Sequence, residues 1–165
     1  MRIKLLIILA LPFVLASCLK SDSDTGCNLT LSTATAPAAE VTQLQAYLTT
    51  NNITATQHSS GIFYVINNPG EGVVPVACSA VMVKYVGRLT TGTVFDNSNI
   101  NNPNGLTFTL GQLIAGWQIG IPLIKKGGSI TLYIPPSLGY GSSGSGSAVP
   151  PNANLIFEIE LVNVQ

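Results

Sequence analysis

Apolar and polar residues alternate along much of the chain from residue 61 onward. In the clearest stretch, ANLIFEIELVNV, every second residue from Leu155 to Leu161 is apolar, and Glu158 and Glu160 lie between them. This period of two predicts a strand of an antiparallel sheet with one buried and one solvated face. Five further runs rich in β-branched and aromatic residues predict additional strands, namely GIFYVIN, AVMVKYVGRL, TVFD, LTFTL and SITLYIP.

Two segments depart from this alternation and have helical features. PAAEVTQLQAYLTTNN begins at Pro37 and places Val41, Leu44 and Leu48 at helical spacing, which predicts a short helix packed on its own domain rather than on a partner. GQLIAGWQIGIPLIKKGG lies between two predicted strands and ends at paired glycines, and its Pro122 can occupy only a kink or a turn. Several strands with one helix among them predict an α+β domain, a single sheet wrapped around a helix.

The first residues have the pattern of an export signal. Arg2 and Lys4 precede an apolar run that is shorter than the about 20 residues needed to span a membrane. The run ends in LASC, which matches the bacterial lipobox, so we predict that residues 1–17 are a signal peptide and that Cys18 carries the lipid. The alternative is ordinary cleavage after Ser17 without lipid. Either cleavage predicts an extracytoplasmic protein, and lipidation would anchor it to a bacterial envelope membrane, in the periplasm or at the cell surface.

The rest of the chain fits one domain with a lead-in. Residues 18–36 are dominated by Ser, Thr, Asp and Ala, which predicts a flexible tether. Residues 37–60 hold the short helix and its lead-in, and residues 61–165 form the domain. The stretch GYGSSGSGSAVPP is too apolar at its end for a linker, so we interpret it as a long loop of the same domain.

Two cysteines remain once Cys18 is assigned to lipid. Cys27 and Cys78 are an even pair in an oxidising compartment and could form a disulfide, although the sequence leaves open whether they approach each other. Together with His58 they match no tetrahedral metal-site spacing. We therefore predict no metal site and no cofactor.

The polar residues exclude several kinds of chemistry. His58 is the only histidine and stands in a polar turn, so a serine nucleophile would lack a base. GSSGSG lacks the Gly-Lys-Ser/Thr ending of a phosphate-binding loop, and Glu158 and Glu160 point to the solvated face of their strand. Basic residues are scattered apart from Lys125 and Lys126, which argues against nucleic acid as a partner.

The aromatic residues suggest another kind of site. Composition alone favours a role in the core, but four blocks in a fixed order, VKYVGRLTTGTVFDNS, FTLGQLIAGWQIGI, GGSITLYIPPSLGYG and AVPPNANLIFEIELVNV, resemble the FKBP-type peptidyl-prolyl isomerase family. The resemblance covers Gly61 to Gln165. It implies a twisted antiparallel sheet around one short helix, an apolar pocket for a proline ring, and catalysis of cis/trans exchange at X-Pro bonds of exported polypeptides, with macrolides as candidate inhibitors.

The resemblance also assigns the residues of the pocket. It implies a catalytic set, Tyr85, Phe95, Asp96, Tyr140 and Phe157. It implies a substrate-binding set, Leu106, Leu113, Ile114, Trp117, Ala148 and Val149. An X-Pro bond isomerises without breaking any covalent bond, so the absence of an acid, a base or a metal from this set is consistent with the implied reaction.

The sequence departs from the family pattern near Asp96. The family often has an Arg a few residues after the Phe-Asp pair, but DNSNINNPNGL contains no basic residue, so we expect Asp96 to orient Tyr85 or to accept bonds from substrate amides. Ala148 and Val149 also form a smaller flap than the family's paired isoleucines. Two other functions therefore stay open: a non-catalytic proline-binding chaperone or adaptor, and an envelope module whose aromatic residues only form a core. The sequence does not predict an oligomeric state.

Overall fold

The structure of the chain is a computed structural model that describes residues 26–100 and 102–165. The predicted signal peptide and Cys18 lie outside the described residues. Among the helices that are described, none is long and apolar enough to cross a membrane.

The described residues form seven strands, two α-helices and four short 3-10 helices. The strands are β1 (Thr56–Gln57), β2 (Phe63–Asn68), β3 (Ala80–Leu89), β4 (Val94–Asn97), β5 (Leu106–Thr109), β6 (Ser129–Ile134) and β7 (Leu155–Val164). The helices are α1 (Ala38–Thr50), α2 (Ala115–Gly120), η1 (Leu110–Gln112), η2 (Ile121–Leu123), η3 (Pro136–Leu138) and η4 (Gly141–Ser143).

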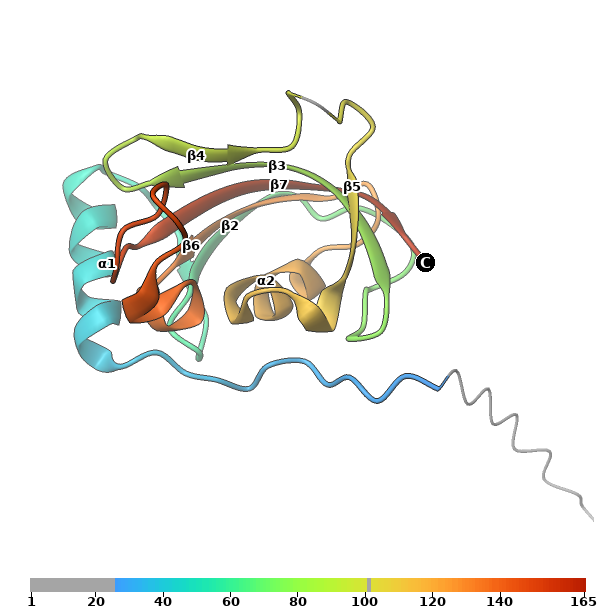
Figure 1. The fold of residues 1–165 in the computed structure, drawn as a ribbon, viewed down its shortest axis with the longest axis horizontal. Helices are drawn as coiled ribbons and strands as arrows, with labels where there is room; N and C mark the ends of the chain where they lie inside the picture. The colour runs from blue at the N-terminus through green and yellow to red at the C-terminus, as the bar shows by residue number, and fades with distance from the viewer. Residues whose placement is uncertain (1–25, 101) are drawn as a thin grey trace, which may run out of the picture.

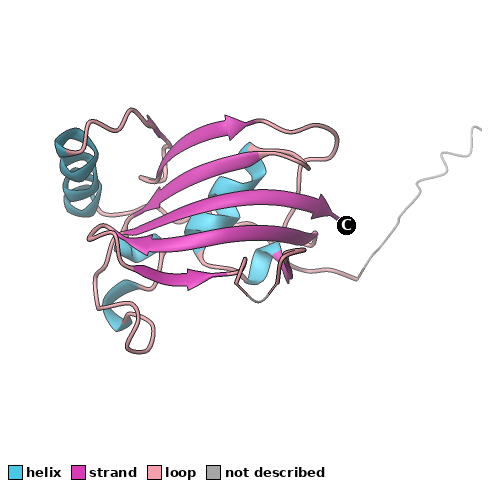
Figure 2. Cartoon of the chain, turned by 90° about the horizontal axis from the view of Figure 1, so that it is seen from above, coloured by secondary structure: helices cyan, strands magenta, loops and turns pink. Residues whose placement is uncertain are grey.

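The strands make one antiparallel sheet in the order β1-β2-β6-β7-β3-β4, and β5 also pairs with β3. The sheet curves around α2, which lies against its concave face (Figure 1). Seen from above, the long strands lie side by side across this helix (Figure 2). The predicted α+β fold, a twisted antiparallel sheet wrapped around one short helix, is confirmed.

The core lies between the concave face and α2. Alternate residues of β3, including Val81 and Val83, are fully buried there, as the period of two predicts. Gly120 of α2 allows a close approach to β6, because a Cβ at this position would lie 2.5 Å from Cδ1 of Leu132. The short helix is thereby pressed directly onto the sheet.

The segment GQLIAGWQIGIPLIKKGG forms a shorter helix than its length suggests. It divides into η1, the six-residue α2 and η2, with Pro122 inside η2. Glycine and proline disfavour a continuous α-helix, which explains the division.

The first helix packs on the other face of the sheet at one end. Leu44 and Leu48 of α1 are buried against Phe63, Tyr133 and Ile156. These three residues lie opposite one another across β2, β6 and β7, so they present one apolar row to the helix. The prediction that this helix packs on its own domain is confirmed.

Residues 26–36, which we call the strap, have extended backbone without regular secondary structure. A disulfide joins Cys27 to Cys78, with the two Cα atoms 6.0 Å apart, and the Ala36 N–H donates to the Ser60 carbonyl oxygen at 2.8 Å. This part of the predicted flexible tether is therefore docked on the domain. The covalent link and the backbone hydrogen bonds offset the entropy lost on ordering it.

Candidate functional site

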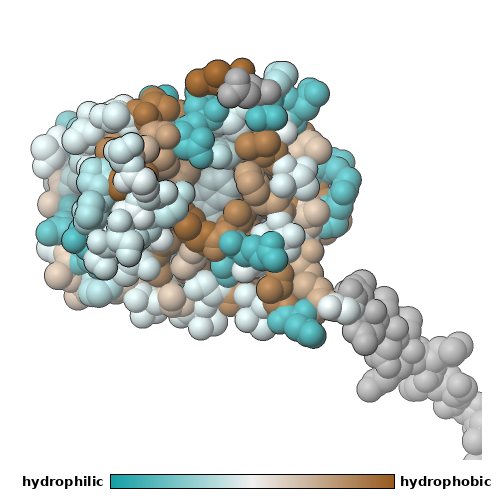
Figure 3. Space-filling model, viewed as in Figure 1, coloured by the Kyte–Doolittle hydropathy of each residue, from teal (hydrophilic) through white to brown (hydrophobic). Residues whose placement is uncertain are grey.

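A pocket of about 230 Å³ lies between the concave face of the sheet and α2. Figure 3 shows apolar side chains gathered in the middle of the face viewed in Figure 1, whereas polar ones dominate around α1. The pocket's lining comes from β3, β4, β5, the turn before α2, α2 itself, the turn after η3, and β7. The lining residues are Tyr85, Asp96, Phe108, Leu113, Ile114, Trp117, Tyr140 and Phe157.

Aromatic rings packed edge to face form the floor and walls of this pocket. Tyr85, Trp117 and Phe157 are 7%, 4% and 2% exposed. The Trp117 ring centroid lies 5.0 Å from that of Tyr85 and 5.1 Å from that of Phe157. Phe95 supports Phe157 at 5.4 Å, and Phe108 supports Trp117 at 6.5 Å. Each such pair contributes about 0.5–1.5 kcal/mol beyond its burial, so the walls are held rigidly.

Asp96 is tied to Tyr85 at the rim of the pocket. The Tyr85 hydroxyl donates to Oδ2 of Asp96 at 2.6 Å. Ser98, 3% exposed, fixes the end of β4, because its Oγ accepts the Tyr85 N–H at 2.8 Å. Burial, together with the hydrogen bond to Asp96 and its negative charge, raises the pKa of Tyr85 far above its ordinary value, so this hydroxyl remains a donor. Within the described part of the chain, Asp96 makes no ion pair.

Two further donors belong to residues that line the pocket and have no acceptor among the described residues. Among the described residues, neither the Ile114 N–H nor the Tyr140 hydroxyl donates to a protein atom. Burial and the negative charge of Asp96 raise the pKa of Tyr140, which keeps this hydroxyl protonated. Both groups can therefore donate to carbonyl oxygens of a ligand that places an apolar group in the pocket.

Four of the predicted site residues do not line this pocket. Phe95 stands behind the wall, and Leu106, on β5, is partly buried against the core. Ala148 is exposed, whereas Val149 is 2% exposed and packs inward. The backbones of Ser145 and Val149 exchange hydrogen bonds of 2.9 and 3.1 Å, which turns Val149 into the core rather than toward a ligand. The expected flap of Ala148 and Val149 is therefore not part of the lining.

Phe108 lines the pocket, although the sequence did not assign it to the predicted catalytic or substrate-binding residues. It alternates with Thr107 and Thr109 and pairs with the fully buried Val81 of β3. The alternation predicts that Phe108 faces inward, but its approach to Trp117 depends on the pairing of β5 with β3. A single sequence does not specify that register.

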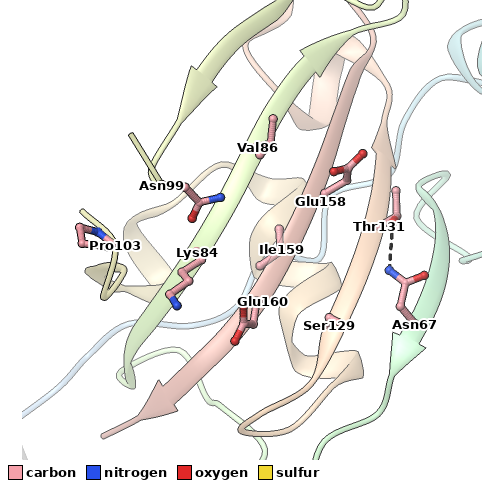
Figure 4. Close-up of a pocket in the computed structure, with 10 residues that line it drawn as sticks. All are labelled: Asn67, Lys84, Val86, Asn99, Pro103, Ser129, Thr131, Glu158, Ile159 and Glu160. Carbon is pink, nitrogen blue, oxygen red and sulfur yellow. Dashed lines mark hydrogen bonds between the residues drawn. The ribbon is translucent and has the colours of Figure 1, made fainter. Parts of the chain in front are cut away.

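A larger hollow of about 590 Å³ lies on the opposite face of the sheet (Figure 4). Asn67 donates from its side chain to Oγ1 of Thr131 at 3.1 Å, and Lys84 lies opposite Glu160 in the β3–β7 register. None of the described residues that line this hollow is aromatic: they are Asn67, Lys84, Val86, Asn99, Pro103, Ser129, Thr131, Glu158, Ile159 and Glu160. An open polar surface of this kind cannot enclose an apolar ring in a dry environment.

The single histidine of the chain, His58, lines neither of these two hollows. Nδ1 of His58 accepts the Ser60 N–H at 3.1 Å and lies 3.0 Å from Oγ of Ser60. Ser60 is only 5% exposed, so the pair closes a turn and the hydroxyl is not presented to a substrate. No cluster of three or more His, Cys, Asp or Glu side chains within residues 26–100 and 102–165 could hold a metal ion.

A concave aromatic pocket with a few hydrogen-bond donors, set in a small α+β domain, is typical of the class of sites that bind an apolar group. Comparison with known proteins identifies the class further. Residues 73–162 match the family model of the FKBP-type peptidyl-prolyl cis-trans isomerases. The chain belongs to this family.

Relatives and solved structures agree with this assignment. A probable FKBP-type peptidyl-prolyl cis-trans isomerase FkpA of Neisseria meningitidis is 45% identical over 106 residues, which are 64% of this chain and 39% of that protein. FK506-binding protein 1 of Dictyostelium discoideum is 42% identical over 103 residues, 62% of this chain and 96% of that protein. The crystal structure of FkpA from Escherichia coli has a TM-score of 0.69 at 36% identity, covering 78% of this chain and 60% of that one. The chain thus aligns with about two fifths of the length of several of the curated relatives it matches.

Proposed function

We propose that the chain catalyses cis/trans isomerisation of X-Pro bonds in polypeptides. The observation that carries this proposal is the apolar aromatic pocket of Tyr85, Trp117 and Phe157, which Ile114 and Tyr140 also line with their free donors. The pocket's volume of about 230 Å³ suits a proline ring, and the donors suit the carbonyl groups that flank it. Family membership supports the same reaction.

The reaction needs a pocket that favours the twisted amide over the planar one. Amide resonance sets a barrier of about 18–20 kcal/mol, and the twisted state loses that resonance and much of the amide dipole. Gripping the proline ring in dry aromatic surroundings disfavours the polar planar amide, while Ile114 and Tyr140 hold the flanking carbonyls. Every tenfold gain in rate requires about 1.4 kcal/mol of this preference.

In this mechanism Asp96 has an orienting role. Its carboxylate accepts the Tyr85 hydroxyl at 2.6 Å and thereby fixes the ring that stands against Trp117 at 5.0 Å. No proton is transferred in the reaction, so neither group acts as an acid or a base. The second carboxylate oxygen remains a candidate acceptor for a substrate amide.

We further propose that the protein acts outside the cytoplasm on exported polypeptides. The support is the signal-like sequence before LASC, with Cys18 as a lipid attachment site, and the disulfide between Cys27 and Cys78, which is typical of oxidising compartments. The name of the Dictyostelium relative supports testing macrolides as inhibitors. Metabolic labelling with a palmitate analogue tests the anchor, and a Cys18-containing product that takes up no label would contradict it.

A matched pair of tyrosine substitutions tests the isomerase proposal. Tyr140→Phe removes a hydroxyl from the pocket, and Tyr133→Phe makes the same change under α1, in a residue that is 7% exposed. In a protease-coupled assay on an X-Pro tetrapeptide, we expect acceleration by the wild-type chain, about 5- to 10-fold lower kcat/KM for Tyr140→Phe, and no change for Tyr133→Phe. A macrolide inhibitor added to the same assay should compete with the peptide.

The assay also separates catalysis from the two other functions. No acceleration by the folded wild-type chain would defeat the isomerase proposal. If proline peptides still quenched or shifted the fluorescence of Trp117, the single tryptophan of the chain, the result would favour a binding chaperone or adaptor. If they did not, the aromatic residues would serve only as core.

A further inference from the structure

One polar side chain on α2 bonds to the turn that carries the Ile114 amide. Nε2 of Gln118 donates to the carbonyl oxygens of Leu113, at 2.6 Å, and of Gly111, at 3.3 Å. Its Oε1 accepts the N–H of Ser32, in the strap, at 2.8 Å. Both the nitrogen and the oxygen of the Gln118 carboxamide thus make hydrogen bonds. If the amide were turned over, its oxygen would lie against two carbonyl oxygens, which cannot donate to it.

We propose that Gln118 is a positioning residue that aims the Ile114 N–H into the pocket. The inference rests on the proposed function, because the Ile114 N–H matters only if a substrate carbonyl accepts it. Gln118 itself does not line the pocket and acts through the main chain of the turn.

Peptide geometry connects Gln118 to the Ile114 N–H. The Leu113 carbonyl and the Ile114 N–H belong to one planar trans peptide unit, so they point in opposite directions. A bond that holds the carbonyl toward Gln118 therefore holds the N–H away from it. Ile114 lines the pocket, and its N–H has no acceptor among the described residues.

The Gln118 bond is what fixes this peptide unit. Leu113 and Ile114 both have extended backbone, with φ of −86° and −58° and ψ of 174° and 148°, and the unit between them can rotate about its two soft dihedrals. Within the described residues, no other group donates to the Leu113 carbonyl oxygen. Loss of the Gln118 donor would thus release the orientation of the Ile114 N–H.

The earlier part of the turn is anchored by backbone bonds to the segment around Cys78. The Leu110 N–H donates to the Ser79 carbonyl oxygen at 3.0 Å, and the Gly111 N–H donates to that of Ala77 at 2.8 Å. Cys78 also holds the strap through its disulfide. At the end of the turn, the Leu113 N–H donates to the Leu110 carbonyl oxygen at 3.1 Å and the Ile114 carbonyl oxygen accepts the Trp117 N–H at 2.9 Å. These bonds hold the peptide units on either side, and only Gln118 engages the Leu113–Ile114 unit between them.

Gln118→Met tests the proposal against a control in the same turn. Methionine keeps the length of the side chain and its helix propensity but cannot donate. Gln112→Met makes the same change at an exposed position, for which the structure shows no side-chain hydrogen bond among the described residues. We expect Gln118→Met to lower kcat/KM about 5- to 10-fold and Gln112→Met to leave it unchanged within about twofold.

Gln118→Glu separates the two sides of the network. A carboxylate still accepts the Ser32 N–H but cannot donate to the Leu113 carbonyl oxygen. If the link to Leu113 is what matters, Gln118→Glu loses at least as much activity as Gln118→Met. A Gln118→Glu variant as active as the wild type would overturn the proposal, and so would equal activities of folded Gln118→Met and Gln112→Met.

The amide resonance of Ile114 provides a readout that a purely structural role would not move. In the wild-type chain and in Gln112→Met, titration with a proline tetrapeptide should shift the Ile114 ¹H–¹⁵N resonance downfield as the N–H gains an acceptor. In Gln118→Met and Gln118→Glu the shift should be less than about half as large at saturation. Equal shifts in all four proteins would refute the positioning role. A wild-type chain that binds the peptide without accelerating isomerisation would instead refute only the proposed reaction.

Discussion

Gly87→Ala is the sharpest test of how the aromatic pocket is built. Gly87 lies in β3 directly opposite Phe157 of β7. A Cβ at this position would lie 2.7 Å from Cζ of Phe95 and 2.9 Å from Cε1 of Phe157. Ordinary contacts between carbon atoms are about 3.5–4.0 Å, so the added methyl requires the rings to move by about 1 Å.

The neighbours decide which ring moves. Phe157 is 2% exposed and its ring centroid lies 5.1 Å from that of Trp117, so we expect the half-buried Phe95 to move outward. Overpacking costs about 1–3 kcal/mol, and the loss of glycine's freedom in the unfolded chain returns about 0.4–1 kcal/mol. The free energy of unfolding should therefore fall by up to about 2.6 kcal/mol. Phe95 supports the pocket wall formed by Phe157, so its movement loosens that wall. Misplacement by 1 Å can cost up to about 100-fold in rate, and we expect kcat/KM to fall by about tenfold.

Urea unfolding and the protease-coupled assay measure the two effects, and a double-mutant cycle assigns their cause. In a Phe95→Ala background the clash with Phe95 is gone and the Phe157 ring gains space to shift away from the added methyl, so the same substitution should cost less there than in the wild-type chain, by about 1 kcal/mol. The reasoning fails if Gly87→Ala raises the free energy of unfolding and leaves kcat/KM unchanged. It also fails if the cycle shows no coupling between the two positions.

Three further predictions use other parts of the structure. Cys27→Ser removes a disulfide between residues 51 positions apart, so the free energy of unfolding in urea should fall by up to about 4 kcal/mol. The folded variant should retain its kcat/KM. An unchanged midpoint of urea unfolding would contradict this prediction. Phe157→Ala should lower kcat/KM more than Asp96→Ala, because the first change removes a pocket wall and the second only releases the Tyr85 hydroxyl. A folded but wholly inactive Asp96→Ala variant would show that Asp96 has a larger role than this. The pKa values of Tyr85 and Tyr140 are raised in the folded state, so their contribution to stability should be complete below about pH 10 and be lost as the pH rises through the raised values. In Tyr85→Phe, the free energy of unfolding should therefore fall less steeply with pH in the alkaline range. An identical slope in the variant and the wild-type chain would contradict the assignment.

The fold follows from the sequence where periodicity is long and uninterrupted. β7 has ten residues, and buried and exposed residues alternate along it from Phe157 to Leu161, so its buried face is predictable. The helix at the centre of the fold is six residues long, from Ala115 to Gly120, and neither spacing nor composition sets its bounds within a run that contains several glycines and a proline. The strap is polar and lacks periodicity, and it is ordered by a disulfide and by hydrogen bonds to residues far along the chain, including Gln118.

The site depended on two different kinds of signal. The order of the motifs placed seven of the eight lining residues, including Tyr85 and Trp117, in the predicted set. Phe108, Ser98 and Gln118 were missed as parts of the site because their roles come from register and from hydrogen bonds to main-chain atoms. A polar residue that fixes a backbone carbonyl has no pattern along the sequence that marks it.

The aromatic residues show why a core and a pocket look alike in sequence. Tyr85, Trp117 and Phe157 are at least 93% buried, as core residues are, yet all three line an open volume of about 230 Å³. Gly87 lies opposite Phe157 and has no side chain, so the Phe95 and Phe157 rings occupy the space beside it. The edge-to-face contact between these two rings keeps Phe157 in its place as a wall of the pocket. An envelope module that used these rings only for stability would gain by filling the hollow, because each buried methylene contributes about 0.8 kcal/mol. The retained hollow therefore favours a binding function for the same residues that stabilise the fold.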